Sequence, residues 1–390
     1  MAADVAAGRP AGAQAAPPSA GPVRLALDRP VRASGPRRGP SAARGRESAG
    51  PRDGSWIWLC GTVTLTLGAF AAAVALAPPA SAPPGRALAW LLFVGSSVHV
   101  ASTGWLYTLP EVRGYARQRP VRLVLLPVAL ILATAAAAAV VRPATLAWAL
   151  LPYYAWQFFH FQKQNLGLAA LAASSRRVAS LRPAERRAIM TAGYAGIAGL
   201  IAHPGLLQLR ISPPGLTWLY PAAAAVFAGA VGVGLAVAAR RPGADGAFWP
   251  YVVYLISLGF FLPVFAFRSP YAAVGGMTIA HGLQYLLLLG LVAAGRRRAA
   301  GRALRLAVLA NIALAGGAVL SAASHLHGAA AAAGRLAFGA YLGAVMAHFV
   351  IDASLWRLRD PFPRAFLAAR VPGLLPGRSP AADGSSADIQ

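Results

Sequence analysis

Residues 335–356 read RLAFGAYLGAVMAHFVIDASLW, an apolar stretch with a histidine and an aspartate in its second half. A helix of about 20 mostly apolar residues spans the roughly 30 Å hydrocarbon core of a bilayer. The stretch therefore predicts a membrane-spanning helix that carries two ionisable side chains, His348 and Asp352. Because an ionisable group is costly in hydrocarbon, such a pair indicates a functional site.

The same apolar pattern recurs along the chain of 390 residues, of which 57% are hydrophobic and 12% are charged. Soluble proteins usually carry about 25% charged residues. The composition therefore predicts an all-α, polytopic integral membrane bundle of about ten transmembrane helices. The ten apolar segments cover approximately residues 56–77, 87–109, 121–141, 144–171, 188–208, 217–239, 247–267, 271–294, 304–323 and 335–356.

The arginines predict how this bundle is oriented. They gather in alternate loops, after the second, fourth, sixth, eighth and tenth segments. Since positively charged loops stay in the cytoplasm, we expect both termini to be cytoplasmic and the protein to lie in the cell membrane. The formal net charge of +25 then favours membrane lipids as partners and argues against nucleic acid.

The composition also divides the chain into three parts. Ala-, Pro- and Arg-rich residues 1–54 predict a disordered cytoplasmic tail, residues 55–360 the transmembrane domain, and residues 361–390 a cytoplasmic C-terminal tail. Cys60 is the only cysteine of the chain. Any metal site must therefore use nitrogen and oxygen ligands.

Four histidines lie at similar depths in four even-numbered segments that are predicted to cross in the same direction: His99, His160, His281 and His348. Each lies roughly 10 to 16 residues from the start of its segment, about 15 to 24 Å into the bilayer. Four imidazoles at one depth predict a metal site. Nitrogen and oxygen ligands without a thiolate suit non-haem Fe(II), with zinc or copper as alternatives.

Asp352 follows His348 by four residues and is the only acidic residue within the ten segments. At that spacing the two side chains share a helical face, so the carboxylate can orient a metal-bound imidazole or supply a proton. Two other interpretations stay open. Asp352 could itself be a metal ligand, or it could pair with Arg357 or Arg359 at the membrane surface.

Two glutamines have a comparable position relative to the other histidines. Gln164 follows His160 by four residues, and Gln284 follows His281 by three. An amide one helical turn from an imidazole is placed to fix that ligand or to relay a proton. We therefore predict Asp352, Gln164 and Gln284 as the catalytic residues beside the metal.

The motifs His160-Phe161 and His281-Gly282, on a background of single histidines on separate helices, resemble the Brp/Blh family of bacterial β-carotene 15,15'-dioxygenases. The members of that family are polytopic membrane proteins whose short histidine motifs are thought to hold iron. The resemblance is spread over the second to tenth segments. It implies a membrane-embedded, iron-dependent oxygenase.

The leading prediction is thus an integral membrane oxidoreductase that uses iron and O2 on a lipophilic substrate from the bilayer, with an unidentified electron-donor protein as a further partner. Two other classes stay open. One is a proton-coupled transporter or channel with a relay of midplane histidines and Asp352. The other is a lipid-binding or assembly protein without turnover. The chain has no His-Glu-x-x-His motif, phosphate-binding loop or dinucleotide glycine fingerprint, which argues against a zincin or a nucleotide-driven pump.

Overall fold

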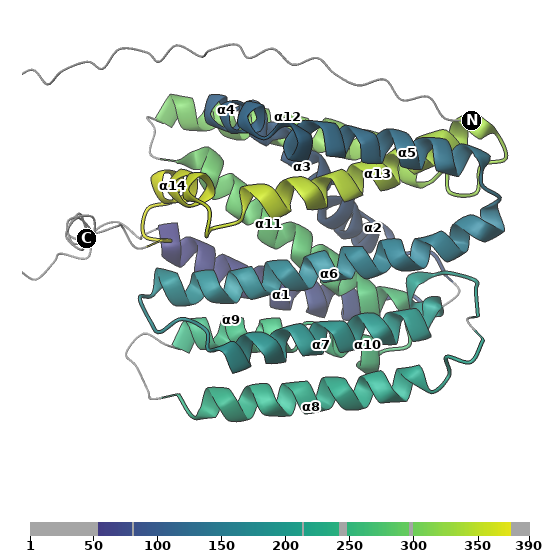
Figure 1. Ribbon diagram of the computed structural model, residues 1–390, viewed down its shortest axis with the longest axis horizontal. Helices are drawn as coiled ribbons and strands as arrows, with labels where there is room; N and C mark the ends of the chain where they lie inside the picture. Colours follow the sequence, from purple (N-terminus) through teal and green to yellow (C-terminus); the bar gives the residue numbers. More distant parts are fainter. Residues whose placement is uncertain (1–53, 80–81, 213, 242–247, 296–298, 376–390) are drawn as a thin grey trace, which may run out of the picture. The chain divides into compact units, whose positions relative to one another are not determined.

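The computed structural model describes residues 54–79, 82–212, 214–241, 248–295 and 299–375. Within these ranges every regular element is a helix, and the helices lie side by side in one bundle (Figure 1). The predicted all-α class is therefore confirmed. The predicted N-terminal tail, apart from Gly54, and the last residues of the predicted C-terminal tail lie outside the described residues.

Seven helices of the described chain are long and apolar enough to cross a membrane, judged by length and composition. Three of them contain a π-helical turn: η1 joins α2 and α3 into one continuous helix, whereas η2 and η4 begin the helices that continue as α5 and α11. The chain is therefore a multi-pass membrane protein by its helices. The seven are α1 (Gly54–Ala75), α2–η1–α3 (Arg86–Leu106), η2–α5 (Val121–Val140), α8 (Leu219–Ala239), η4–α11 (Tyr271–Ala294), α12 (Ala299–Ser324) and α13 (Ala332–Leu355).

The three other predicted segments are also helical but differ from this pattern. Helix α6 (Pro143–Ser175) has 33 residues and a polar centre, and α7 (Pro183–Ala202) begins in a charged turn. The segment expected at 247–267 is divided into α9 (Phe248–Leu258) and α10 (Leu262–Ala266). The division falls at a tight turn, in which the Leu262 N–H donates to the carbonyl of Gly259, just before Pro263 in the first turn of α10.

Short helices complete the described chain: α4 (Pro110–Gln118), η3 (Pro204–Leu207) and α14 (Pro361–Arg370). Helix α14 lies in the predicted C-terminal tail, yet Leu367 is only 1% exposed and α14 packs against α11. Arg370 Nη2 donates to Glu111 Oε1 of α4 at 2.7 Å. The folded unit therefore extends beyond the predicted boundary at residue 360, because α14 has its own apolar face.

The same ion pair affects the ionisation of Glu111. Partial burial alone would raise the pKa of this carboxyl group. Hydrogen bonds from the backbone and from the Arg370 guanidinium outweigh burial and hold the pKa below its ordinary value.

Two glycines on one face of α13 allow it to approach α5 closely. A Cβ at Gly339 would lie 2.8 Å from the Cα of Ala135, and one at Gly343 would lie 2.5 Å from the Cα of Ile131. A Gly-x-x-x-Gly spacing of this kind is typical of close helix pairs in membranes. The pairing of α13 with α5 fixes the helix that carries His348 and Asp352.

A buried ion pair fastens α7 to the end of α8. Glu185 is 1% exposed, and Arg241 donates to both of its carboxylate oxygens, at 2.6 and 2.7 Å. The same guanidinium also donates to the carbonyls of Ala179 and Ser180 in the preceding loop. Arg241, which the sequence pattern used only as an indicator of membrane orientation, thus connects two helices and a loop.

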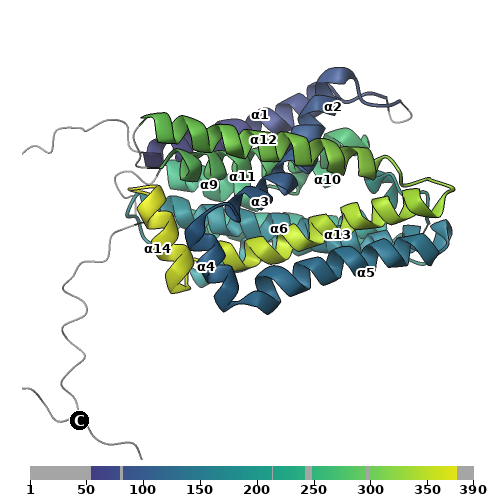
Figure 2. The same ribbon diagram turned by 90° about the horizontal axis from the view of Figure 1, so that it is seen from above.

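Helix α11 crosses the neighbouring helices diagonally (Figure 1), and α12 passes in front of it in the view of Figure 2. Helix α11 packs against α1 on one side and against η1, α3 and α12 on the other. This position brings the first half of α11, which carries His281, next to the helices that carry the other histidines.

Candidate metal centre

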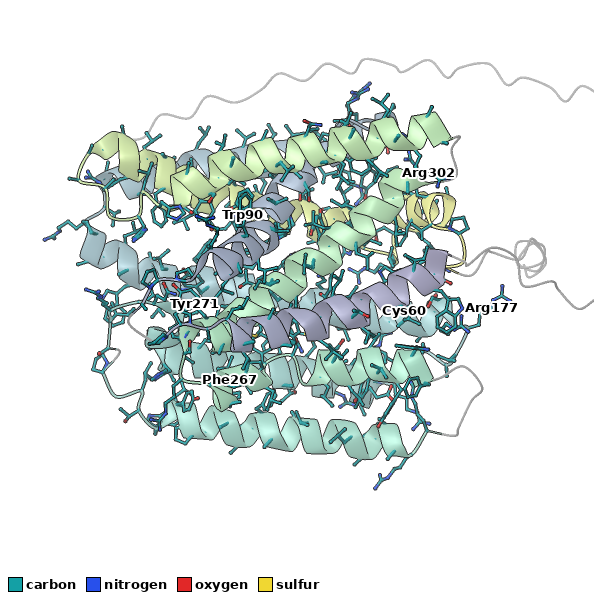
Figure 3. All side chains as sticks on the ribbon, turned by 180° about the vertical axis from the view of Figure 1, so that it is seen from behind. Cys60, Trp90, Arg177, Phe267, Tyr271 and Arg302 are labelled. Carbon is teal, nitrogen blue, oxygen red and sulfur yellow. The ribbon has the colours of Figure 1, made fainter. Side chains whose placement is uncertain are left out.

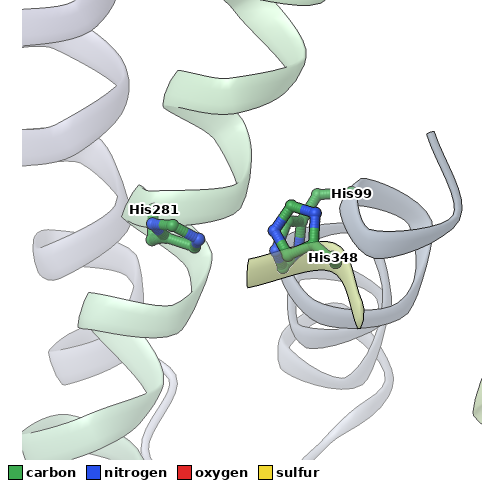
Figure 4. Close-up of side chains that lie close together, drawn as sticks. All are labelled: His99, His281 and His348. Carbon is green, nitrogen blue, oxygen red and sulfur yellow. The ribbon is translucent and has the colours of Figure 1, made fainter. Parts of the chain in front are cut away.

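The four predicted histidines come from four helices and meet inside the bundle. His99 begins α3, His160 lies in α6, His281 in α11 and His348 in α13. Figure 4 shows the rings of His99, His281 and His348 converging from their three helices. These three residues are at most 3% exposed, whereas the side chain of His160 is 11% exposed.

A close backbone contact brings His99 and His281 together. A Cβ at Gly95, in the π-helical turn η1 (Val94–Val98), would lie 2.6 Å from the Cα of Ile279. A Cβ at Gly282 would collide with the backbone of Gly95. Only two glycines fit here, so the backbones touch directly beside both histidines. The π-helical turn ends immediately before His99, and such turns often occur at functional sites.

The four rings form a closed square. Its sides, measured between ring centroids, are 5.0 Å from His99 to His281, 5.0 Å from His281 to His160, 5.3 Å from His160 to His348 and 5.0 Å from His348 to His99. The diagonal from His281 to His348 is 6.5 Å. One nitrogen from each of His99, His281 and His348 lies within 4.8 Å of the other two.

Most nitrogens of this square have no hydrogen-bond partner among the described residues. These are both ring nitrogens of His281, Nε2 of His160 and of His348, and, by strict hydrogen-bond geometry, both ring nitrogens of His99, which lies close to the backbone of Gly95 and Ser96. Buried polar atoms in proteins almost always have a partner. A group of unpartnered imidazole nitrogens that face one another therefore fits a bound cation.

Asp352 lies at one edge of the square and uses its two oxygens differently. Oδ1 accepts hydrogen bonds from the Tyr285 hydroxyl at 2.8 Å and from the Trp356 indole N–H at 3.3 Å. Oδ2 lies 3.6 Å from His348 Nε2 and 3.9 Å from His160 Nε2.

Asp352 does not pair with Arg357 or Arg359, as the alternative interpretation of the sequence required. Both arginines lie in the described chain, and the basic side chains within 4.0 Å of the Asp352 carboxylate there are the imidazoles of His160 and His348. The carboxylate is 4% exposed, so it lies inside the bundle rather than at the surface.

Two further residues that the sequence analysis did not assign to the site complete it. Thr103 Oγ1 lies 2.6 Å from His348 Nδ1 and 3.0 Å from the Tyr285 hydroxyl oxygen. Thr103 follows His99 by four residues, and Tyr285 follows His281 by four. Asp352 follows His348 by the same four residues. A search for polar side chains one helical turn after each histidine could therefore have identified Tyr285 from the sequence.

Gln164 and Gln284 lie next to each other but bond to no imidazole nitrogen. Gln164 Nε2 donates to Gln284 Oε1 at 3.0 Å and to the backbone carbonyl of His281 at 3.1 Å. Gln284 Nε2 donates to Thr66 Oγ1 at 2.7 Å. The two amides thus connect α6, α11 and α1, and they position the backbone of His281 rather than its ring.

Aromatic side chains enclose the square. Phe161 stacks on the ring of His281 with 4.0 Å between centroids, and Phe349 stacks on His160 at 4.5 Å. An apolar surround of this kind keeps water away from a metal and lowers the local dielectric.

The chain matches no protein-family model, no curated protein and no solved structure. Its function must therefore be argued from the site itself.

Proposed function

We propose that this chain is an integral membrane oxidoreductase that holds one non-haem Fe(II) at His99, His160, His281 and His348 and acts with O2 on a lipophilic substrate. The observation that carries the proposal is the square of buried, unpartnered imidazole nitrogens with Asp352 Oδ2 at its edge. Ligands about 2.1 Å from one ion lie roughly 3 to 4.2 Å from one another. The Oδ2 to Nε2 distances of 3.6 and 3.9 Å fall within this range.

The donor set supports a first-row transition metal. Imidazoles and a carboxylate without thiolate suit iron, and zinc and copper are the alternatives. Bound iron would provide the ability to react with O2. The resemblance to the Brp/Blh family favours iron over zinc and copper. The four histidines would hold the ion, and Asp352 would balance its charge through Oδ2. Gln164 and Gln284 would fix the helix that carries His281.

The pattern of exposure supports a substrate that enters from the bilayer. Of the four imidazoles, His160 is the most exposed, and it lies one helical turn from Trp156, which is 36% exposed. Trp156 and Phe349 make an edge-to-face contact beside it. An apolar molecule dissolved in the membrane would reach the metal along this side of α6.

We also propose that α6, α7 and the pair α9–α10 cross the membrane, which gives ten spans with both termini in the cytoplasm. Arg177, in the turn after α6, and Arg302, in the first turn of α12, lie at the same end of the helices (Figure 3), as this topology requires. The cell membrane is the proposed location, and an electron-donor protein would dock on its cytoplasmic side.

Metal analysis of the detergent-purified protein tests the proposal. We expect about one iron per chain, with loss of that iron in His160→Ala and His348→Ala because each substitution removes a ligand. His325→Ala is the matched control, since His325 is exposed and lies outside the square. A wild-type protein without stoichiometric transition metal would overturn the proposal.

The same preparations separate the other two classes. Proton-coupled flux into proteoliposomes that is lost in Asp352→Asn would favour the transporter. Histidine substitutions that change only thermal stability, with no metal in the wild type, would favour a lipid-binding or assembly protein.

A further inference from the structure

We infer that Thr103 and Tyr285 are positioning residues that prepare His348 to bind a metal through Nε2, by a hydrogen-bond chain with one fixed direction. The inference rests on the proposed metal site and adds two residues to it. Both are buried, Thr103 at 3% and Tyr285 at 2% exposed.

The direction of this hydrogen-bond chain is set at its Asp352 end. Beside a bound cation Asp352 is ionised, and an ionised carboxylate oxygen can only accept, so the Tyr285 hydroxyl gives its single proton to Asp352 Oδ1. The Tyr285 oxygen then acts as acceptor in its contact with Thr103, and the Thr103 hydroxyl must donate. Since Thr103 has used its only proton, its oxygen must accept from His348 Nδ1.

This direction decides which nitrogen of His348 is free. A neutral imidazole carries one proton, and the chain places that proton on Nδ1. Nε2 is left with a lone pair, and it is the buried, unpartnered nitrogen that lies 3.6 Å from Asp352 Oδ2. With the chain reversed, the proton would be on Nε2 and Tyr285 could not donate to Asp352.

The chain also orients the carboxylate. Tyr285 and Trp356 both donate to Oδ1, which leaves Oδ2 facing the imidazoles. His348 and Asp352 share α13, while Thr103 lies on α3 and Tyr285 on α11. Three helices therefore fix the orientation of two neighbouring groups, and both hydroxyl-bearing side chains that do so are buried.

Binding of Co(II) to the purified protein, followed by its visible absorption and by competition with a chelator, tests the inference. We expect Tyr285→Phe and Thr103→Val to bind Co(II) about 10- to 100-fold more weakly, because orienting partners of ligands contribute that much. We also expect a shifted absorption band. Thr103→Ser keeps the hydroxyl and should restore both affinity and spectrum.

Tyr254→Phe is the matched control, since Tyr254 is a buried tyrosine whose hydroxyl donates to the Gly234 carbonyl away from the square. If both Tyr285→Phe and Thr103→Val keep the wild-type affinity and spectrum, the proposed role of the hydrogen-bond chain is wrong, although the proposed metal site is not affected. Equal loss in Thr103→Ser and Thr103→Val would overturn the role of the hydroxyl. Absence of Co(II) binding in the wild type would overturn the proposed function and the inference together.

Discussion

At the scale of single residues, the two carboxylate oxygens of Asp352 have different partners: Oδ1 accepts hydrogen bonds, and Oδ2 faces the imidazoles. Asp352→Asn keeps an oxygen to accept from Tyr285 but places an NH2 group where Oδ2 faces the imidazoles. An NH2 group has no lone pair to offer and carries no charge. We expect the variant to fold and to bind iron about 10- to 100-fold more weakly, measured as metal retained after dialysis.

Asp360→Asn provides the control for that measurement, because Asp360 pairs with Arg119 outside the square. Iron retention equal to the wild type in Asp352→Asn would mean that Oδ2 does not contribute to metal binding.

Residue spacing within one helix could be predicted from the sequence, and contacts between helices could not. His348 and Asp352 are four residues apart, so their proximity follows from helical geometry. Thr103 and His348 are 245 residues apart, and their contact depends on how α3 is rotated against α13. The same limit explains the glutamines, whose spacing suggested ring contacts although they bond to each other and to the backbone of His281.

At the scale of helices, the glycine contact between η1 and α11 sets the distance between His99 and His281, two of the proposed metal ligands. Gly282→Ala would push the backbones of these elements apart. We expect it to lower the free energy of unfolding by about 1–3 kcal/mol, as overpacking does, and to lower metal affinity as well. Thermal unfolding in detergent and metal content are the measurements.

Gly290→Ala on the same helix is the matched control, because a Cβ there meets open space. If both variants behave alike, the close approach at Gly282 does not shape the site.

The length of each apolar segment predicted where a helix lies but not where that helix is interrupted. Each of the ten segments is helical, yet the one at 247–267 is broken after Leu258. The π-helical turns η1, η2 and η4 leave no mark in an apolar pattern, because they insert a residue without changing composition. Helix α14 was missed because its ten residues lie among prolines and arginines that resemble a tail.

At the scale of the whole molecule, the proposed topology can be tested with single cysteines. Cys60→Ser removes the only native thiol. In that background we expect Ser180→Cys, in the loop between α6 and α7, to resist a membrane-impermeant maleimide in intact cells. Gly328→Cys, in the loop between α12 and α13, should react, since ten spans place these loops on opposite sides.

Labelling of both cysteines after membrane disruption is the control for accessibility. Labelling of Ser180→Cys in intact cells would show that the loop after α6 is external and would contradict the proposed ten-span orientation.

The π-helical turn before His99 has a consequence for how such a site can arise. One residue added to a helix turns everything beyond it by about 100°. Without the extra residue in η1, the helical face that now bears His99 would point elsewhere, and the square would lose a corner. A single inserted codon in an ordinary membrane helix is therefore enough to bring a fourth nitrogen into such a square, and a single deletion is enough to remove it.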